Sequence, residues 1–125
     1  MNMIRIGIVG YGNIGQFVLD ALETAPDFEV AGVVRRSISN IPAELNGYSV
    51  VTDIDQLENV DVAILCTPTR EVEKYATQYL AKGINTVDSF DIHTGIADLR
   101  RNLNSVAQAN GTVAIISAGW DPGSD

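Results

Sequence analysis

The chain has 125 residues, of which 46% are hydrophobic, and its formal net charge is −8. This length and composition indicate one small globular domain with a sizeable core, and the acidic balance argues against nucleic acid as a partner. No apolar run reaches the roughly 18 residues of a membrane span, and the N-terminus lacks a signal-peptide pattern. The single cysteine, Cys66, excludes an intrachain disulfide and a cysteine-based metal site. We therefore expect a cytoplasmic protein without a membrane or a metal.

The chain opens with a pattern typical of a buried parallel strand followed by a helix. Residues 4–9 are apolar apart from Arg5, and apolar side chains then recur at helical spacing from Ile14 to Ala25. The turn between them reads Gly10-Tyr11-Gly12-Asn13-Ile14-Gly15. In this context the glycines would let the backbone approach a pyrophosphate, which the amides at the start of the helix would bind. The alternative interpretation is a glycine-rich turn that binds nothing.

The second expected strand, over residues 29–34, indicates which dinucleotide would bind. It is followed by Arg35-Arg36-Ser37, at the place where NAD-binding domains carry an Asp or Glu for the ribose 2′-hydroxyl. Two guanidinium groups and a hydroxyl suit a 2′-phosphate instead. The residues therefore favour NADP over NAD, and the alternative is an ordinary solvated basic pair, which we expect of Arg100-Arg101.

Strand and helix patterns alternate through the rest of the chain. We expect a loop over 39–47, a strand over 48–51, and a short helix begun by a capping box at Asp53. Next come a strand over 60–66, a helix that Gly83 ends, a strand over 84–88, a helix over 96–107 closed by Asn110-Gly111, and a strand over 113–117. This order predicts a Rossmann-type α/β fold, a doubly wound, mostly parallel sheet with helices on both faces.

Ligands of such sheets bind outside the carboxyl ends of the strands. Beyond the glycine turn and the arginine pair, these ends carry three segments: Cys66-Thr67-Pro68-Thr69, Asp88-Ser89-Phe90-Asp91-Ile92-His93 and Ala118-Gly119-Trp120-Asp121-Pro122-Gly123. Thr67 to Thr69 are expected beside the ribose or phosphates of the cofactor, although Thr69 fits equally well as a helix cap. For Cys66 a packed thiol is favoured over a nucleophile, and for His93 a helix cap over a general base.

Two acidic residues suggest a substrate. Asp91 and Asp121 lie in the turns after two successive strands, where their carboxylates would suit the ammonium group of a cationic substrate. The alternative is that Asp88 and Asp91 only stabilise a turn and a helix cap.

Four segments together resemble the meso-diaminopimelate dehydrogenase family, namely residues 8–15, Arg35-Arg36, 86–93 and Gly119-Trp120-Asp121-Pro122-Gly123. The resemblance runs from about Met3 to Gly123. It implies an oxidoreductase of lysine and cell-wall precursor metabolism that uses NADP. Such an enzyme reversibly deaminates the D-centre of meso-2,6-diaminopimelate, giving L-2-amino-6-oxopimelate and ammonia.

The resemblance also implies roles for individual residues. NADP contacts would come from Gly10 to Gly15, Arg35 to Ser37 and Cys66 to Thr69, completed by Ser89, Phe90, Ala118, Gly119 and Pro122. Asp91, Trp120 and Asp121 would form the substrate pocket and aim the reacting C–H bond at the nicotinamide, so that positioning supplies much of the catalysis.

Members of that family continue for well over a hundred further residues. We therefore expect residues 1–125 to be a dinucleotide-binding domain that lacks the substrate and dimerisation domain, turns over little substrate alone, and belongs to a homodimer at full length. Two alternatives stay open. One is another NAD(P)-dependent dehydrogenase, acting on a sugar, an aspartate-like amino acid or a dihydropicolinate. The other is a non-catalytic module that senses the dinucleotide.

Overall fold

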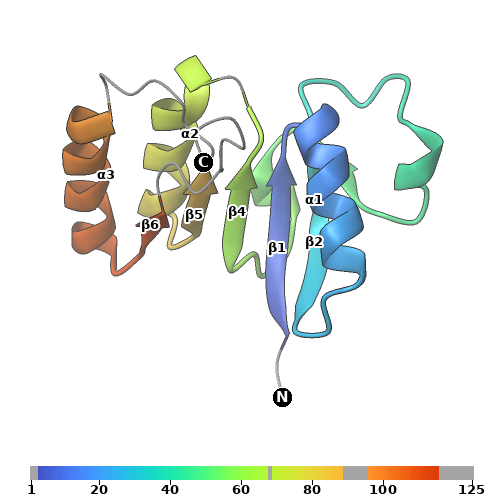
Figure 1. Ribbon diagram of the computed structural model, residues 1–125, viewed down its shortest axis with the longest axis horizontal. Helices are drawn as coiled ribbons and strands as arrows, with labels where there is room; N and C mark the ends of the chain where they lie inside the picture. The colour runs from blue at the N-terminus through green and yellow to red at the C-terminus, as the bar shows by residue number, and fades with distance from the viewer. Residues whose placement is uncertain (1–2, 68, 89–95, 116–125) are drawn as a thin grey trace, which may run out of the picture.

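The computed structural model describes residues 3–67, 69–88 and 96–115, and the strands in this part form one parallel six-stranded sheet (Figure 1). The strands are β1 (Ile4–Val9), β2 (Phe28–Val34), β3 (Val50–Val51), β4 (Val62–Leu65), β5 (Asn85–Asp88) and β6 (Ala114–Ile115). The helices are α1 (Asn13–Glu23), α2 (Thr69–Ala81) and α3 (Ile96–Asn110), with 3-10 turns η1 (Ala43–Leu45) and η2 (Ile54–Gln56). The strand order β3-β2-β1-β4-β5-β6 confirms the predicted Rossmann-type, doubly wound sheet.

Strand β1 is central because it pairs with β2 on one side and β4 on the other. Ile8 lies opposite Val33 of β2 and Ile64 of β4, and its side chain is fully buried. Arg5, the one charged residue of β1, lies near the open start of the strand and donates a 2.8 Å hydrogen bond to Glu29 of β2. The apolar opening strand therefore ends at the centre of the sheet edge where ligands of this fold bind.

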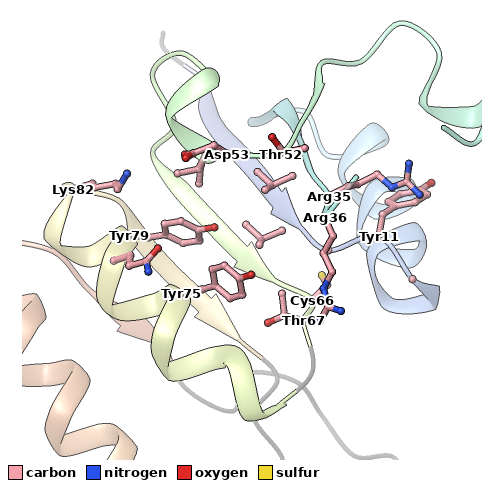
Figure 2. A pocket seen from close by; sticks show the side chains of 16 residues that line it. Tyr11, Arg35, Arg36, Thr52, Asp53, Cys66, Thr67, Tyr75, Tyr79 and Lys82 are labelled. Carbon is pink, nitrogen blue, oxygen red and sulfur yellow. The ribbon is translucent and has the colours of Figure 1, made fainter. Parts of the chain in front are cut away.

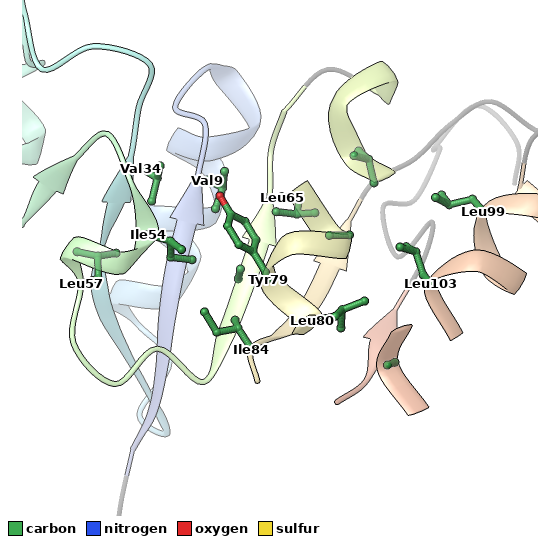
Figure 3. Packing of buried hydrophobic residues seen from close by; sticks show 14 residues of the cluster. Val9, Val34, Ile54, Leu57, Leu65, Tyr79, Leu80, Ile84, Leu99 and Leu103 are labelled. Atoms are coloured by element: carbon green, nitrogen blue, oxygen red, sulfur yellow. The ribbon is translucent and has the colours of Figure 1, made fainter. Parts of the chain in front are cut away.

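The described helices cover the two faces of the sheet unequally. Helices α2 and α3 pack on one face, and their apolar side chains join those of β4 in the larger core, including Leu65, Tyr79, Leu80, Leu99 and Leu103 (Figure 3). Helix α1 covers β1 and β2 on the other face, where Ile8, Leu19, Val33 and Leu45 form a smaller cluster. On this second face, the register aligns Ile64, Val87 and Ile115 in a row across β4, β5 and β6, and these three side chains are only partly buried or exposed.

Several predicted boundaries are confirmed in detail. The capping box of η2 is present, since the Asp53 carboxylate accepts from the Asp55 amide at 2.9 Å and the Gln56 side chain accepts from the Asp53 amide at 3.1 Å. Helices α2 and α3 end just before Gly83 and Gly111, which have φ values of +86° and +66°. These are the left-handed conformations that glycine adopts readily at a helix end.

Other boundaries differ from the prediction. The region expected as a loop over 39–47 contains η1, and the Tyr48 amide bonds the Leu45 carbonyl at 3.0 Å, so β3 starts at Val50 rather than at residue 48. Strand β4 is shorter than the predicted 60–66, and α1 ends at Glu23 because the Thr24 amide turns back to the Ala21 carbonyl at 3.4 Å. Strand β6 occupies 114–115 of the predicted 113–117, of which 116–117 lie outside the described residues.

Among the described residues, no helix combines the length and the apolar character that crossing a membrane requires.

Candidate functional site

A cleft of about 510 Å³ opens beside the carboxyl end of β1 (Figure 2). Its walls come from the glycine turn, the ends of β2 and β4, the start of η2 and one side of α2. The lining residues are Val9, Gly10, Tyr11, Gly12, Val34, Arg35, Arg36, Thr52, Asp53, Ile54, Cys66, Thr67, Tyr75, Gln78, Tyr79 and Lys82. The fold therefore brings together three of the segments that the sequence placed at a ligand site.

The three glycines of the turn have different surroundings. Gly10 has a φ of +89°, and a Cβ added there would lie 2.9 Å from the Cys66 carbonyl oxygen. A Cβ on Gly15 would lie 2.6 Å from the Gly10 carbonyl oxygen, whereas a Cβ on Gly12 would meet no atom within 4 Å. Backbone packing thus requires Gly10 and Gly15 to be small, while Gly12 leaves open space on the cleft.

Helix α1 begins at this open space. Gly12 is its N-cap, and no side chain of the described residues donates or accepts a capping hydrogen bond there. The amides of a first helical turn have no partner within the helix and carry a partial positive charge, so an uncapped start is suited to an anion. The open backbone at Gly12 and the uncapped amides together fit a pyrophosphate.

The arginine pair lies at the adjacent end of β2. The Arg35 amide bonds the Val51 carbonyl at 2.8 Å, and its guanidinium donates to the Ser39 carbonyl at 3.4 Å. The Arg36 side chain is 76% exposed, and its Nη2 lies 2.6 Å from Oε2 of Glu71 in the first turn of α2. Both arginines line the cleft, so their charges are available to a phosphate.

Ser37, the third predicted residue of this segment, is not among the cleft-lining residues. Its hydroxyl oxygen accepts a hydrogen bond from the Ser39 amide at 3.0 Å, which stabilises the turn after β2. A phosphate contact from Ser37 remains a prediction.

The end of β4 contributes Cys66 and Thr67. Burial raises the pKa of the Cys66 thiol to about 11, which keeps it protonated near neutral pH and favours a packed thiol over a nucleophile. The hydroxyl oxygen of Thr67 is buried and has no hydrogen-bond partner within the described part of the chain. Because an unpaired buried hydroxyl is unfavourable, a ligand atom in the cleft would be a suitable partner.

The wall formed by α2 was not identified as part of the site from the sequence. Helical spacing placed Tyr75 and Tyr79 on a buried face, and the structure shows that both also line the cleft (Figure 2). The exposed Gln78 lines it as well. Their rings stack with centroids 6.0 Å apart. Aromatic residues at core spacing give no signal that distinguishes a core from a cleft wall, so only the fold reveals this role.

The remaining predicted residues are placed less fully. Ile14 and Gly15 lie in the first turn of α1, and the Ile14 side chain is 54% exposed. Asn13 is the first residue of α1 and Thr69 the first residue of α2. The following predicted residues lie outside the described part of the chain: Pro68, Ser89, Phe90, Asp91, His93, Ala118, Gly119, Trp120, Asp121 and Pro122.

Known proteins similar to this chain share its fold. The sequence model of an oxidoreductase family with an NAD-binding Rossmann fold matches residues 4–116. A Bacteroides fragilis protein named meso-diaminopimelate D-dehydrogenase is 70% identical over 126 residues, which cover 100% of this chain and 42% of the relative. This chain therefore spans less than half the length of that relative.

Two solved structures are also similar. One is the Corynebacterium glutamicum DAP dehydrogenase in complex with DAP, with a TM-score of 0.83, 33% identity and coverage of 98% of this chain and 38% of that chain. The other is an engineered D-amino acid dehydrogenase bound to NADP⁺, with a TM-score of 0.79, 32% identity and coverage of 98% and 38%.

Proposed function

This chain belongs to the oxidoreductase family with an NAD-binding Rossmann fold, and we propose that it is the cofactor-binding domain of an NADP-dependent meso-diaminopimelate dehydrogenase. The observation that carries the proposal is the 70% identity to the Bacteroides fragilis enzyme, which extends over the whole chain. Since the chain spans 42% of that relative, the proposed activity is that of a longer protein, in which residues 1–125 form one domain. The proposed location is the cytoplasm and the proposed assembly a homodimer.

The geometry of the cleft supports NADP as the cofactor. The pyrophosphate would lie over Gly12 and the start of α1, where the backbone is open and the helix is uncapped. The 2′-phosphate would lie against Arg35 and Arg36, which line the same cleft at the end of β2. Guanidinium groups bind phosphate with charge-assisted hydrogen bonds. NAD has a free 2′-hydroxyl, which a carboxylate would bind, and Arg35 and Arg36 provide no carboxylate.

The proposed reaction needs little bond-making by the protein. When bound, the nicotinamide ring supplies the acceptor for the hydride that leaves the D-centre of meso-2,6-diaminopimelate. The substrate amine loses a proton as the imine forms, and water then converts the imine to L-2-amino-6-oxopimelate and ammonia.

We assign the substrate side of this reaction to Asp91, Trp120 and Asp121. The two carboxylates would hold the reacting amino group by charge-assisted hydrogen bonds, and one of them would accept the proton that the amine releases. Trp120 would form a wall that fixes the orientation of the C–H bond, so that positioning lowers the barrier. The identity to the Bacteroides fragilis enzyme favours this reaction over a sugar, aspartate or dihydropicolinate dehydrogenase and over a dinucleotide sensor.

A calorimetric titration with NADPH and then NADH tests the cofactor assignment. We expect tighter binding of NADPH, and a loss of roughly 10- to 100-fold in that affinity in Arg36→Ala, because a hydrogen bond to a charged group contributes about 1.5–3 kcal/mol. Arg101→Ala is the matched control, since Arg101 is an exposed arginine of α3 paired 3.5 Å from Asp98, away from the cleft. Equal affinity for both cofactors, or an equal loss in both variants, would refute the phosphate site.

The substrate assignment needs the longer protein. Incubated with meso-2,6-diaminopimelate and NADP⁺, it should form NADPH and release ammonia in equal amounts. Turnover of a different amino acid or a sugar, with none of diaminopimelate, would overturn the assigned substrate and leave the cofactor site intact.

A further inference from the structure

The Arg36–Glu71 ion pair joins the end of β2 to the start of α2, two elements that contribute walls to the cleft. Arg36 follows β2 and lines the cleft, whereas Glu71 lies in the first turn of α2, and Nη2 and Oε2 are 2.6 Å apart. The two side chains are 76% and 30% exposed. An ion pair at such exposure contributes little to folding, so its position on the cleft matters more than its effect on stability.

This pair makes the two arginines of the cleft electrostatically different. Arg35 donates to a neutral carbonyl, that of Ser39, while Arg36 shares its charge with a carboxylate. A guanidinium has five N–H donors, and among the described residues the Nη2 contact with Glu71 is the one side-chain interaction of Arg36. Arg36 can therefore bind a phosphate through its other nitrogens while Glu71 stays in place.

In that arrangement Glu71 opposes the phosphate. A phosphate bound to the same guanidinium would lie within about 7 Å of the Glu71 carboxylate, and two negative groups at that separation repel each other even near the solvent. The uncharged 2′-hydroxyl of NAD experiences no comparable repulsion. On this argument the Glu71 carboxylate would weaken the binding of NADP and leave that of NAD unchanged.

From this geometry we propose that Glu71 is a specificity-determining residue, which lowers the preference of the cleft for NADP over NAD. The inference rests on the proposed function, because it assigns the 2′-phosphate to Arg36. It predicts that Glu71→Gln, which keeps the size of the side chain and removes its charge, raises the affinity for NADPH roughly three- to tenfold. The affinity for NADH should change by less than about twofold, and the gain should shrink at high ionic strength.

The test is a titration of wild type, Glu71→Gln and two further variants with both reduced cofactors, at low and high salt. Glu73→Gln is the charge-matched control: it lies on the same helix, but its carboxylate accepts from Asn102 of α3 at 3.2 Å, away from the cleft. Glu71→Asp keeps the charge and should retain a cofactor ratio close to that of wild type.

The possible outcomes separate this inference from the proposed function. A selective gain for NADPH in Glu71→Gln alone supports it. A loss of NADPH affinity, an equal change for both cofactors, or the same gain in Glu73→Gln overturns it while leaving the phosphate site in place. If wild type binds neither cofactor, the proposed function itself fails, and this inference fails with it.

Discussion

The glycine turn allows a matched pair of substitutions, Gly12→Ala and Gly15→Ala, which add the same methyl group to different surroundings. At Gly12 the added carbon would meet no atom within 4 Å, and the φ of −101° is acceptable to alanine. At Gly15 it would lie 2.6 Å from the Gly10 carbonyl oxygen, a backbone atom that cannot rotate away. The first change should fill ligand space, and the second should strain the turn itself.

The structure sets the size of each effect. Overpacking at Gly15 should cost about 1–3 kcal/mol, of which the better helix propensity of alanine returns about 1 kcal/mol. Because the atom met at Gly15 belongs to the rigid backbone, the cost should lie near the upper end of that range, and a net loss of about 2 kcal/mol lowers the melting temperature of a domain of this size by about 8 °C. At Gly12, alanine is a poorer N-cap residue than glycine, and this replacement should cost about 1 kcal/mol. The new methyl group would hold a pyrophosphate away from the amides of α1, and we expect NADPH affinity to fall by about tenfold or more, which is ~1.4 kcal/mol or more.

Thermal unfolding followed by circular dichroism, together with NADPH titration of each variant, measures both effects. We expect Gly12→Ala to melt slightly below wild type and bind NADPH poorly, and Gly15→Ala to melt lower still. Unchanged affinity in Gly12→Ala would refute the placement of the pyrophosphate over this residue. A lower melting temperature in Gly12→Ala than in Gly15→Ala would refute the packing argument.

Three further predictions concern packing and reactivity. Thr86→Val should raise the unfolding free energy by about 1 kcal/mol, because it removes a fully buried hydroxyl without a hydrogen-bond partner in the described residues. A lower urea midpoint for this variant than for wild type would contradict the prediction. Leu65→Ala should lower the unfolding free energy by about 2–5 kcal/mol, because Leu65 is 1% exposed in the larger core. Ile64→Ala should lower it clearly less, because Ile64 is only partly buried. Equal losses of unfolding free energy would contradict the partial burial of Ile64. Burial raises the pKa of the Cys66 thiol from 9.0 to about 11, so this thiol should react with iodoacetamide at pH 8 about a hundredfold more slowly than an unperturbed thiol. The reaction should become faster as the pH rises toward 11. Rapid modification of the folded protein at pH 8 would disprove the burial of this thiol.

Much of the fold follows from short-range signals in the sequence. The strand, glycine turn and helix at residues 4–23 are recognisable because each has its own spacing and the turn needs glycine at Gly10 and Gly15. The capping box at Asp53 and the glycines after α2 and α3 are local devices that need no knowledge of the tertiary structure. Such features are predictable because the residues that cause them lie within one turn of the chain.

Features that depend on distant residues were not predictable. Turn η1 has three residues and no periodicity, and its one signal is an apolar residue, Leu45, that is buried against α1 and β2. The Arg36–Glu71 pair joins elements that only the sheet brings together. Tyr75 and Tyr79 show helical core spacing whether or not a cleft lies beside them. For the same reason the sequence predicted segments that line the cleft, but not the wall that α2 forms.

The glycine turn is completed by a strand that lies far from it in the sequence. Gly10 rests against the Cys66 backbone, and the Cys66 amide bonds the Val9 carbonyl at 2.7 Å, so the turn reaches its final shape only when β1 and β4 have paired. A dinucleotide that recognises this shape therefore binds the folded sheet and not the isolated β1–α1 segment. At 100 times its Kd it would add about 2.7 kcal/mol to the global unfolding free energy. Amide hydrogens of β1 and β4 should then exchange more slowly together, since the ligand acts on the cooperative unit of the fold rather than on one loop.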